Sequence, residues 1–102
     1  MQLADILPAP RVAIDVAALS KKAALEELAR LAAIETPNLT PAQAFDGLIA
    51  RERLGSTGLG NGIAIPHGRI AHLQAMQGAF MRTATPIDFD AVDGEPVDLF
   101  FA

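Results

Sequence analysis

The chain has 102 residues, of which 51% are hydrophobic and 20% are charged, and this predicts one folded domain spanning residues 1–102. Its formal net charge of -4 argues against nucleic acid or an anionic membrane as a partner. The absence of cysteine excludes disulfides, thiolate nucleophiles and thiolate metal sites. No apolar run approaches the roughly 20 residues of a membrane helix, and the N-terminus has no signal-peptide pattern, so we expect a cytoplasmic protein without membrane insertion.

The first third of the chain is expected to hold a short strand and then a helix. Pro8 and Pro10 disfavour an early helix, so residues 1–14 are expected to be extended and to end in an edge strand. Ser20 is suited to cap a helix, and strong helix formers follow it. The residue before a proline avoids helical conformation, and Pro37 therefore predicts a helix end near Ile34.

A second helix has a strong start signal. Thr40 can cap it, Pro41 suits its first position, and Gln43 can complete a capping box. Gly55 is expected in a left-handed conformation just past its end. The apolar residues expected on its buried face are Phe45, Leu48, Ile49 and Leu54.

Short apolar runs dominate the second half of the chain. They predict strands over 63–65, 78–81, 87–89 and 97–102, with an Asp-Gly turn at 93–94. Helices followed by such strands predict an α/β fold, a mixed β-sheet flanked by helices. The last run resembles the middle of a buried strand, so we expect that the C-terminal part of the domain is missing from this sequence.

Residues 55–62 form a glycine-rich segment with glycine at 55, 58, 60 and 62. Backbone N–H groups of such a loop can bind an anion, and Ser56, Thr57 and Arg51 would add further donors. An ordinary turn is the alternative for a glycine-rich loop taken alone. Neither the P-loop pattern nor Gly-x-Gly-x-x-Gly is present, so a nucleotide site is not expected.

His67 follows this segment between Pro66 and Gly68. A neutral imidazole keeps a lone pair on one ring nitrogen for attack on phosphorus while a hydrogen bond holds the other. A structural or surface histidine is the alternative, but the loop and Arg51 favour a nucleophile. His72 lies five residues later, a spacing that does not put two ligands on one helix face, so we expect it to face solvent.

The remaining charged residues are expected to play lesser roles. Lys21 and Lys22 are expected to face solvent or a partner, and Glu52 is expected to be solvated, with orientation of a neighbouring arginine as the alternative. The aspartates at 88, 90 and 93 resemble turn residues rather than a metal cluster. We therefore expect no metal and no other cofactor.

The segment 51–68 closely resembles the enzyme IIA domains of the mannitol/fructose class in the bacterial phosphotransferase system. Its form Gly-Ser-Thr-Gly-Leu-Gly-Asn-Gly-Ile-Ala-Ile-Pro-His-Gly is most similar to the nitrogen-regulatory branch. Further similarity lies at 20–22, 85–91 and 93–99. The resemblance thus covers nearly the whole chain and implies the IIA fold.

The resemblance also implies the chemistry. His67 would accept a phosphoryl group from an HPr-like phosphohistidine carrier protein, and Arg51 would help to hold that group. Family members continue past the last strand to a second active-site histidine, which this sequence lacks. The implied regulatory targets include potassium-transport and sensor-kinase proteins. The loop residues expected around the phosphoryl group are Ser56, Thr57, Gly58, Gly60, Asn61 and Gly68.

These observations favour a regulatory phosphocarrier, which changes its binding partners with its phosphorylation state. One alternative is a sugar-specific IIA component that passes phosphate to a IIB transport subunit. Another is a non-catalytic binding module that keeps the fold and has lost the chemistry.

Overall fold

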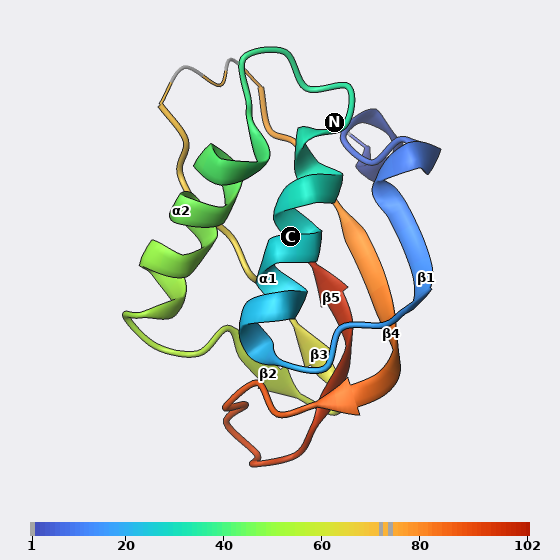
Figure 1. Cartoon of the computed structure of the whole chain (residues 1–102), viewed down its shortest axis with the longest axis vertical. Helices are drawn as coiled ribbons and strands as arrows, with labels where there is room; N and C mark the ends of the chain where they lie inside the picture. The colour runs from blue at the N-terminus through green and yellow to red at the C-terminus, as the bar shows by residue number, and fades with distance from the viewer. Residues whose placement is uncertain (1, 72, 74) are drawn as a thin grey trace.

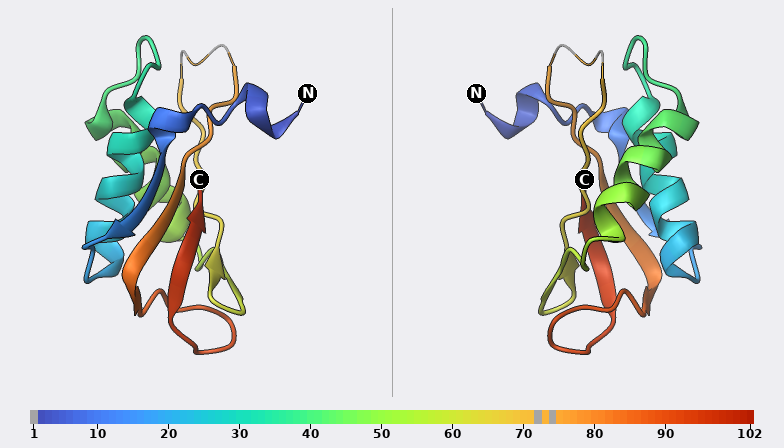
Figure 2. Two further views of the ribbon diagram at one scale, coloured as in Figure 1. Left: turned by 90° about the vertical axis from the view of Figure 1, so that its right-hand side faces the viewer. Right: turned by 90° about the vertical axis from the view of Figure 1, so that its left-hand side faces the viewer.

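In the computed structural model, which describes residues 2–71, 73 and 75–102, two helices cover one face of a five-stranded sheet (Figures 1 and 2). The helices are α1 (Lys21–Ala33) and α2 (Pro41–Glu52). The strands are β1 (Val12–Val16), β2 (Gly58–Gly60), β3 (Ile63–Ala64), β4 (Phe80–Ile87) and β5 (Val97–Phe101). Their order in the sheet is β1-β4-β5-β3-β2. The pairs β1–β4 and β3–β5 are parallel and the others antiparallel, which confirms the predicted mixed sheet.

Both helices begin at the predicted caps. The Ser20 hydroxyl accepts a hydrogen bond from the Ala23 N–H at 3.1 Å. Thr40 Oγ1 accepts from the Gln43 N–H at 3.1 Å, and Gln43 Oε1 accepts from the Thr40 N–H at 3.0 Å. These bonds satisfy N–H groups that have no partner within the helix, which explains why each helix starts where it does. α1 ends at Ala33, next to the predicted Ile34.

The core lies between the two helices and the sheet. Leu25 and Leu28 of α1 are fully buried, as are Met81 of β4 and Phe100 of β5. Met81 lies opposite Phe100 across the β4–β5 pair, so both point toward the helices. The ring of Phe100 meets that of Phe89 edge to face, with centroids 5.2 Å apart.

Neither α1 nor α2 covers the other face of the sheet (Figure 2). Val12 and Ile14 on β1 point to this side and are 42% and 62% exposed. None of the described helices has the length and apolar character needed to cross a bilayer.

Several local predictions were wrong. Two short 3₁₀ helices, Leu3–Asp5 and Ala9–Arg11, stand where extended chain was expected. Pro10 lies in the first turn of the second one, where an N–H is not needed. Leu54, predicted to be buried, is 84% exposed, because it lies beyond the end of α2.

The glycine after α2 and the strand near Phe89 also differ from expectation. Gly55 has a φ of 154°, far from the left-handed helical value of about 57°. Ile87 is the last residue of the long strand β4, and Phe89 lies in the following loop. The predicted turn at 93–94 is confirmed, since the Gly94 N–H bonds the Ala91 carbonyl at 2.9 Å.

Candidate functional site

Part of the glycine-rich segment is a small hairpin. β2 and β3 are joined by Asn61 and Gly62, whose φ angles are 56° and 78°. Positive φ at both central residues is the signature of the type I′ turn, which suits the twist of a hairpin. The segment is thus a hairpin and not the loop that its glycines predict, although the Asn-Gly dipeptide signals such a turn. The hairpin directs the chain into Ile65, Pro66 and His67.

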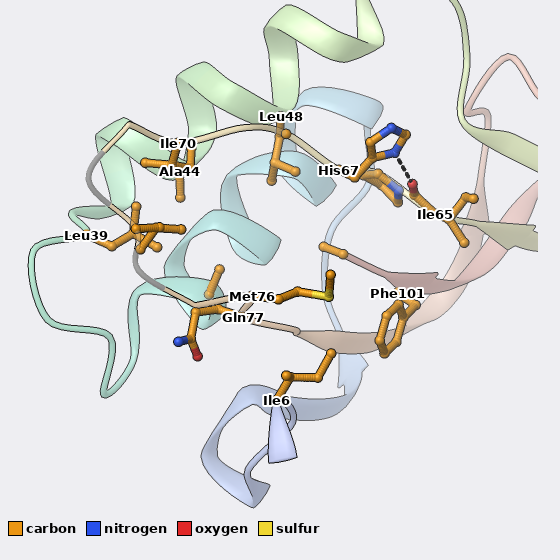
Figure 3. Close-up of a pocket in the computed structure, with 15 residues that line it drawn as sticks. Ile6, Leu39, Ala44, Leu48, Ile65, His67, Ile70, Met76, Gln77 and Phe101 are labelled. Carbon is orange, nitrogen blue, oxygen red and sulfur yellow. Dashed lines mark hydrogen bonds between the residues drawn. The ribbon is translucent and has the colours of Figure 1, made fainter. Parts of the chain in front are cut away.

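His67 is an exposed residue between two firmly anchored ones. Pro66 is fully buried, and Gly68 lies so close to α2 that a Cβ there would come within 2.6 Å of the Gly47 backbone. His67 Nδ1 lies 3.0 Å from the carbonyl oxygen of Ile65 (Figure 3). A carbonyl can only accept, so Nδ1 carries the proton and Nε2 of the neutral ring keeps its lone pair.

A pocket of about 450 Å³ opens beside this histidine. His67 lies at its rim, next to Ile65 (Figure 3). Its wall is mainly apolar and is contributed by α2, the segment after His67 and the end of β5. The larger apolar side chains that line it include Ile6, Leu39, Leu48, Ile70, Met76 and Phe101.

Glu52, the last residue of α2, is only 5% exposed, so the prediction of a solvated side chain was wrong. Its carboxylate accepts hydrogen bonds from the Thr57 N–H at 3.0 Å and the Thr57 hydroxyl at 2.6 Å. The helical spacing could have predicted this burial. Residues four apart lie on the same helix face, and Glu52 follows the buried Leu48 by four residues.

Lys21 is the cation that faces this buried carboxylate, so the prediction that it faces solvent or a partner was wrong. Its ammonium lies 3.0 Å from Glu52 and 3.2 Å from Asp90, over the ring of Phe89. Burial alone would lower the pKa of the Lys21 ammonium, but the hydrogen bonds and charges of the two carboxylates raise it above its ordinary 10.5. Lys22 is exposed as predicted.

Several of the predicted loop donors are bound within the protein. The Ser56 hydroxyl donates to the Phe89 carbonyl at 2.7 Å and accepts from the Gly58 N–H at 3.1 Å. The Asn61 N–H donates to Asp93 at 3.0 Å. Together with Thr57, these groups fasten the glycine-rich segment to its neighbours.

Arg51 donates to the Gly55 carbonyl at 2.8 Å, and no hydrogen bond joins it to His67 among the described residues. It lies one helical turn after Gly47, the residue that Gly68 contacts. Arg51 and His67 thus belong to adjacent parts of the molecule. Their joint role, like that of the loop residues, stays a prediction.

The second histidine, His72, lies outside the described residues, so its predicted solvent position is not addressed. Within residues 2–71, 73 and 75–102, no group of three or more histidine, aspartate and glutamate side chains is arranged to hold a metal ion.

The contact between Gly68 and Gly47 predicts unequal losses of stability when either glycine is replaced by alanine. Gly68→Ala would place a Cβ 2.6 Å from backbone atoms, and we expect it to lower the free energy of unfolding by about 1–3 kcal/mol. Gly47→Ala would meet only the flexible end of Ile70 and would gain up to about 1 kcal/mol of helix propensity, so we expect almost no net loss. Chemical denaturation measures both, and equal losses would contradict a rigid contact at Gly68.

The hairpin turn predicts a pH dependence at Asp93. Its carboxylate accepts N–H groups of Glu95 and Asn61, each at 3.0 Å, and these bonds lower the pKa of Asp93 below its ordinary 3.8. A lowered pKa stabilises the fold above pH 3.8, and this stabilisation is lost as the pH falls through the lower folded value. We expect the stability difference between the wild type and Asp93→Asn to shrink over that acidic range. A constant difference in denaturation experiments across it would be the contrary result.

Comparison with known proteins agrees with this fold. Residues 5–102 match the family described as "Phosphoenolpyruvate-dependent sugar phosphotransferase system, EIIA 2", and the chain belongs to this family. Within it, the chain is a homologue of nitrogen regulatory proteins. It is 48% identical over 101 residues to the "Nitrogen regulatory protein" of Pseudomonas aeruginosa and 46% identical over 104 residues to that of Escherichia coli K12.

A solved structure supports the same assignment. The nitrogen regulatory protein IIA-Ntr from Neisseria meningitidis has a TM-score of 0.91 and 48% identity, over 97% of this chain and 67% of that chain. This match confirms the IIA-type fold predicted from the sequence. The Pseudomonas and Escherichia alignments cover 99% and 100% of this chain but only 66% and 63% of those relatives' lengths.

Proposed function

We propose that this protein is a regulatory phosphocarrier of the nitrogen-related phosphotransferase system. His67 accepts a phosphoryl group from an HPr-like carrier, and its phosphorylation state changes which target proteins are bound. The observation that carries the proposal is the hydrogen bond between His67 Nδ1 and the Ile65 carbonyl, which leaves the Nε2 lone pair for attack.

The chemistry is a transfer between two imidazoles. Nε2 of His67 attacks phosphorus and forms a new N–P bond, while the N–P bond of the carrier breaks and its electron pair returns to the carrier's ring nitrogen. The proton on His67 Nδ1 stays in its bond to Ile65. Negative charge on the phosphoryl oxygens requires nearby donors. Arg51 is proposed to supply a guanidinium, because only one of its five N–H donors is needed for the Gly55 carbonyl.

The partners follow from the family and the surroundings of His67. An HPr-like carrier is proposed as the phosphoryl donor, and potassium-transport or sensor-kinase proteins are proposed as regulatory targets. The apolar pocket at the histidine suits such contacts, since the desolvated centre of a protein interface is apolar. The higher identity to nitrogen regulatory proteins, 48%, than to a fructose-specific EIIA component, 34%, favours regulation over sugar transport.

The test is phosphoryl transfer from a phosphorylated HPr-like carrier. We expect the protein to gain an acid-labile, base-stable label and one phosphate in its intact mass, with fragmentation locating the group on His67. Failure to take up label from a carrier that phosphorylates a nitrogen regulatory IIA protein in parallel would reject the proposal. A sugar-uptake assay with IIB and IIC partners separates regulation from transport.

A further inference from the structure

We propose that Glu52, held by Lys21, is a positioning residue that fixes the ring of His67 through Thr57 and Ile65. The inference rests on the proposed phosphoryl acceptance by His67 and assigns a role to two charges that the transfer itself does not use.

A continuous series of short hydrogen bonds joins the ion pair to the histidine. Glu52 lies 3.0 Å from the Lys21 ammonium and accepts from the Thr57 hydroxyl at 2.6 Å and the Thr57 N–H at 3.0 Å. The Thr57 carbonyl accepts from the Ile65 N–H at 3.0 Å. The Ile65 carbonyl in turn lies 3.0 Å from His67 Nδ1. Glu52 thus holds Thr57, Thr57 holds the backbone of Ile65, and Ile65 holds the ring of His67.

Burial makes the first part of this series rigid. Glu52 and Thr57 are 5% and 4% exposed, so neither can exchange its partner for water without opening the structure. A buried carboxylate is costly unless it is paired and hydrogen-bonded, and Lys21 and Thr57 meet both needs. The same lysine reaches Asp90 and thereby ties the start of α1 to the loop after β4. Movement of Thr57 is therefore resisted by three separate parts of the chain.

The far end of the series decides the chemistry of His67. The Ile65 carbonyl selects the tautomer with the proton on Nδ1, and only this tautomer presents an unprotonated Nε2. A shift of that carbonyl would weaken the bond and populate the opposite tautomer. Misplacement of a reacting group by about 1 Å can reduce a rate by about 100-fold, so modest loosening at Thr57 would be visible in phosphoryl transfer.

Variants at each step test the inference. Thr57→Val removes the hydroxyl that bonds Glu52 while keeping its shape, Thr57→Ser keeps the hydroxyl, and Glu52→Gln removes the charge. The matched control is Glu27→Gln, which breaks the ion pair with Arg30 elsewhere on α1. The ring tautomer of His67 is read from ¹H–¹⁵N spectra of the unphosphorylated full chain in mildly alkaline buffer. Transfer rates from the phosphorylated carrier and thermal midpoints are measured alongside.

We expect Thr57→Val and Glu52→Gln to raise the population of the Nε2–H tautomer of His67 and to slow phosphoryl transfer by about 10- to 100-fold. Thr57→Ser should keep the wild-type spectrum of His67, and Glu27→Gln should leave that spectrum unchanged as well. A purely structural role would lower thermal midpoints without moving the tautomer. The inference is overturned if folded Thr57→Val keeps the wild-type tautomer of His67. It is also overturned if Thr57→Val and Thr57→Ser change the tautomer population equally.

The two proposals fail separately. Absence of label on the wild type would reject phosphoryl acceptance, whereas the spectra of unphosphorylated protein test positioning without any transfer. A variant that does not fold is replaced by Lys21→Met, which removes the cation from the half-buried edge of the network. An unchanged His67 tautomer in Lys21→Met would equally contradict the inference.

Discussion

Replacing His67 with glutamine is expected to abolish phosphoryl acceptance while leaving the fold intact. The amide has no nucleophilic lone pair comparable to that of Nε2, and loss of a nucleophile typically costs more than about 10⁴-fold in rate. The residue is exposed and its side chain hydrogen-bonds the Ile65 carbonyl, so the free energy of unfolding should change by less than about 0.5 kcal/mol. Carrier-dependent labelling and chemical denaturation measure the two effects.

Arg69 offers a matched control for this prediction. It is exposed, lies two residues after His67 and has no assigned role at the site. Arg69→Gln should retain acid-labile label at His67. Label of wild-type intensity on His67→Gln would show that another residue accepts the phosphoryl group.

Removing the Phe100 side chain is expected to have the largest effect on stability. Phe100 is fully buried at the centre of the sheet, between Met81 and Ala64 in register and against the ring of Phe89. Phe100→Ala should lower the free energy of unfolding by about 3–5 kcal/mol, because both transfer energy and a cavity contribute. Domains of this kind are stable by roughly 5–15 kcal/mol, so much of the total would be lost. Urea denaturation gives the difference.

The next residue provides the comparison. Phe101 points to the opposite face of the sheet and is half-buried at the pocket. Phe101→Ala should cost no more than about 2 kcal/mol. Equal losses for the two variants would mean that the core is not confined to the helix side of the sheet.

The parts of the fold that were predictable depend on local chemistry. Ser20 and Thr40 cap their helices through atoms within three residues, so their signals are visible in the sequence. The turn at 93–94 is local in the same sense. The prediction for His67 rests on a motif that lies in one continuous segment, and its role stays a prediction. The Asn-Gly dipeptide at 61–62 is a local signal of the same kind, and it would have predicted the type I′ turn.

The errors at Lys21 and Glu52 have a different origin. These residues are 31 positions apart, and their ion pair exists only because α1 and α2 pack together. A lysine in the first turn of a helix is unfavourable by itself, and the sequence contains no sign of the carboxylate that compensates it. Likewise, the hydrogen bond from the Ser56 hydroxyl to the Phe89 carbonyl, 33 residues away, could not be read from the sequence.

The central place of β5 has a consequence for the order of assembly. β5 joins β4 on one side and β3 on the other, so among the described strands it is β5 that links the two parts of the sheet. During synthesis, α1 and α2 can pair early, but the hairpin that leads to His67 has no neighbouring strand to dock on until residue 101 has left the ribosome. The surroundings of His67 are therefore completed only after β5 has formed, and a ribosome stalled before β5 should display paired helices without a docked hairpin.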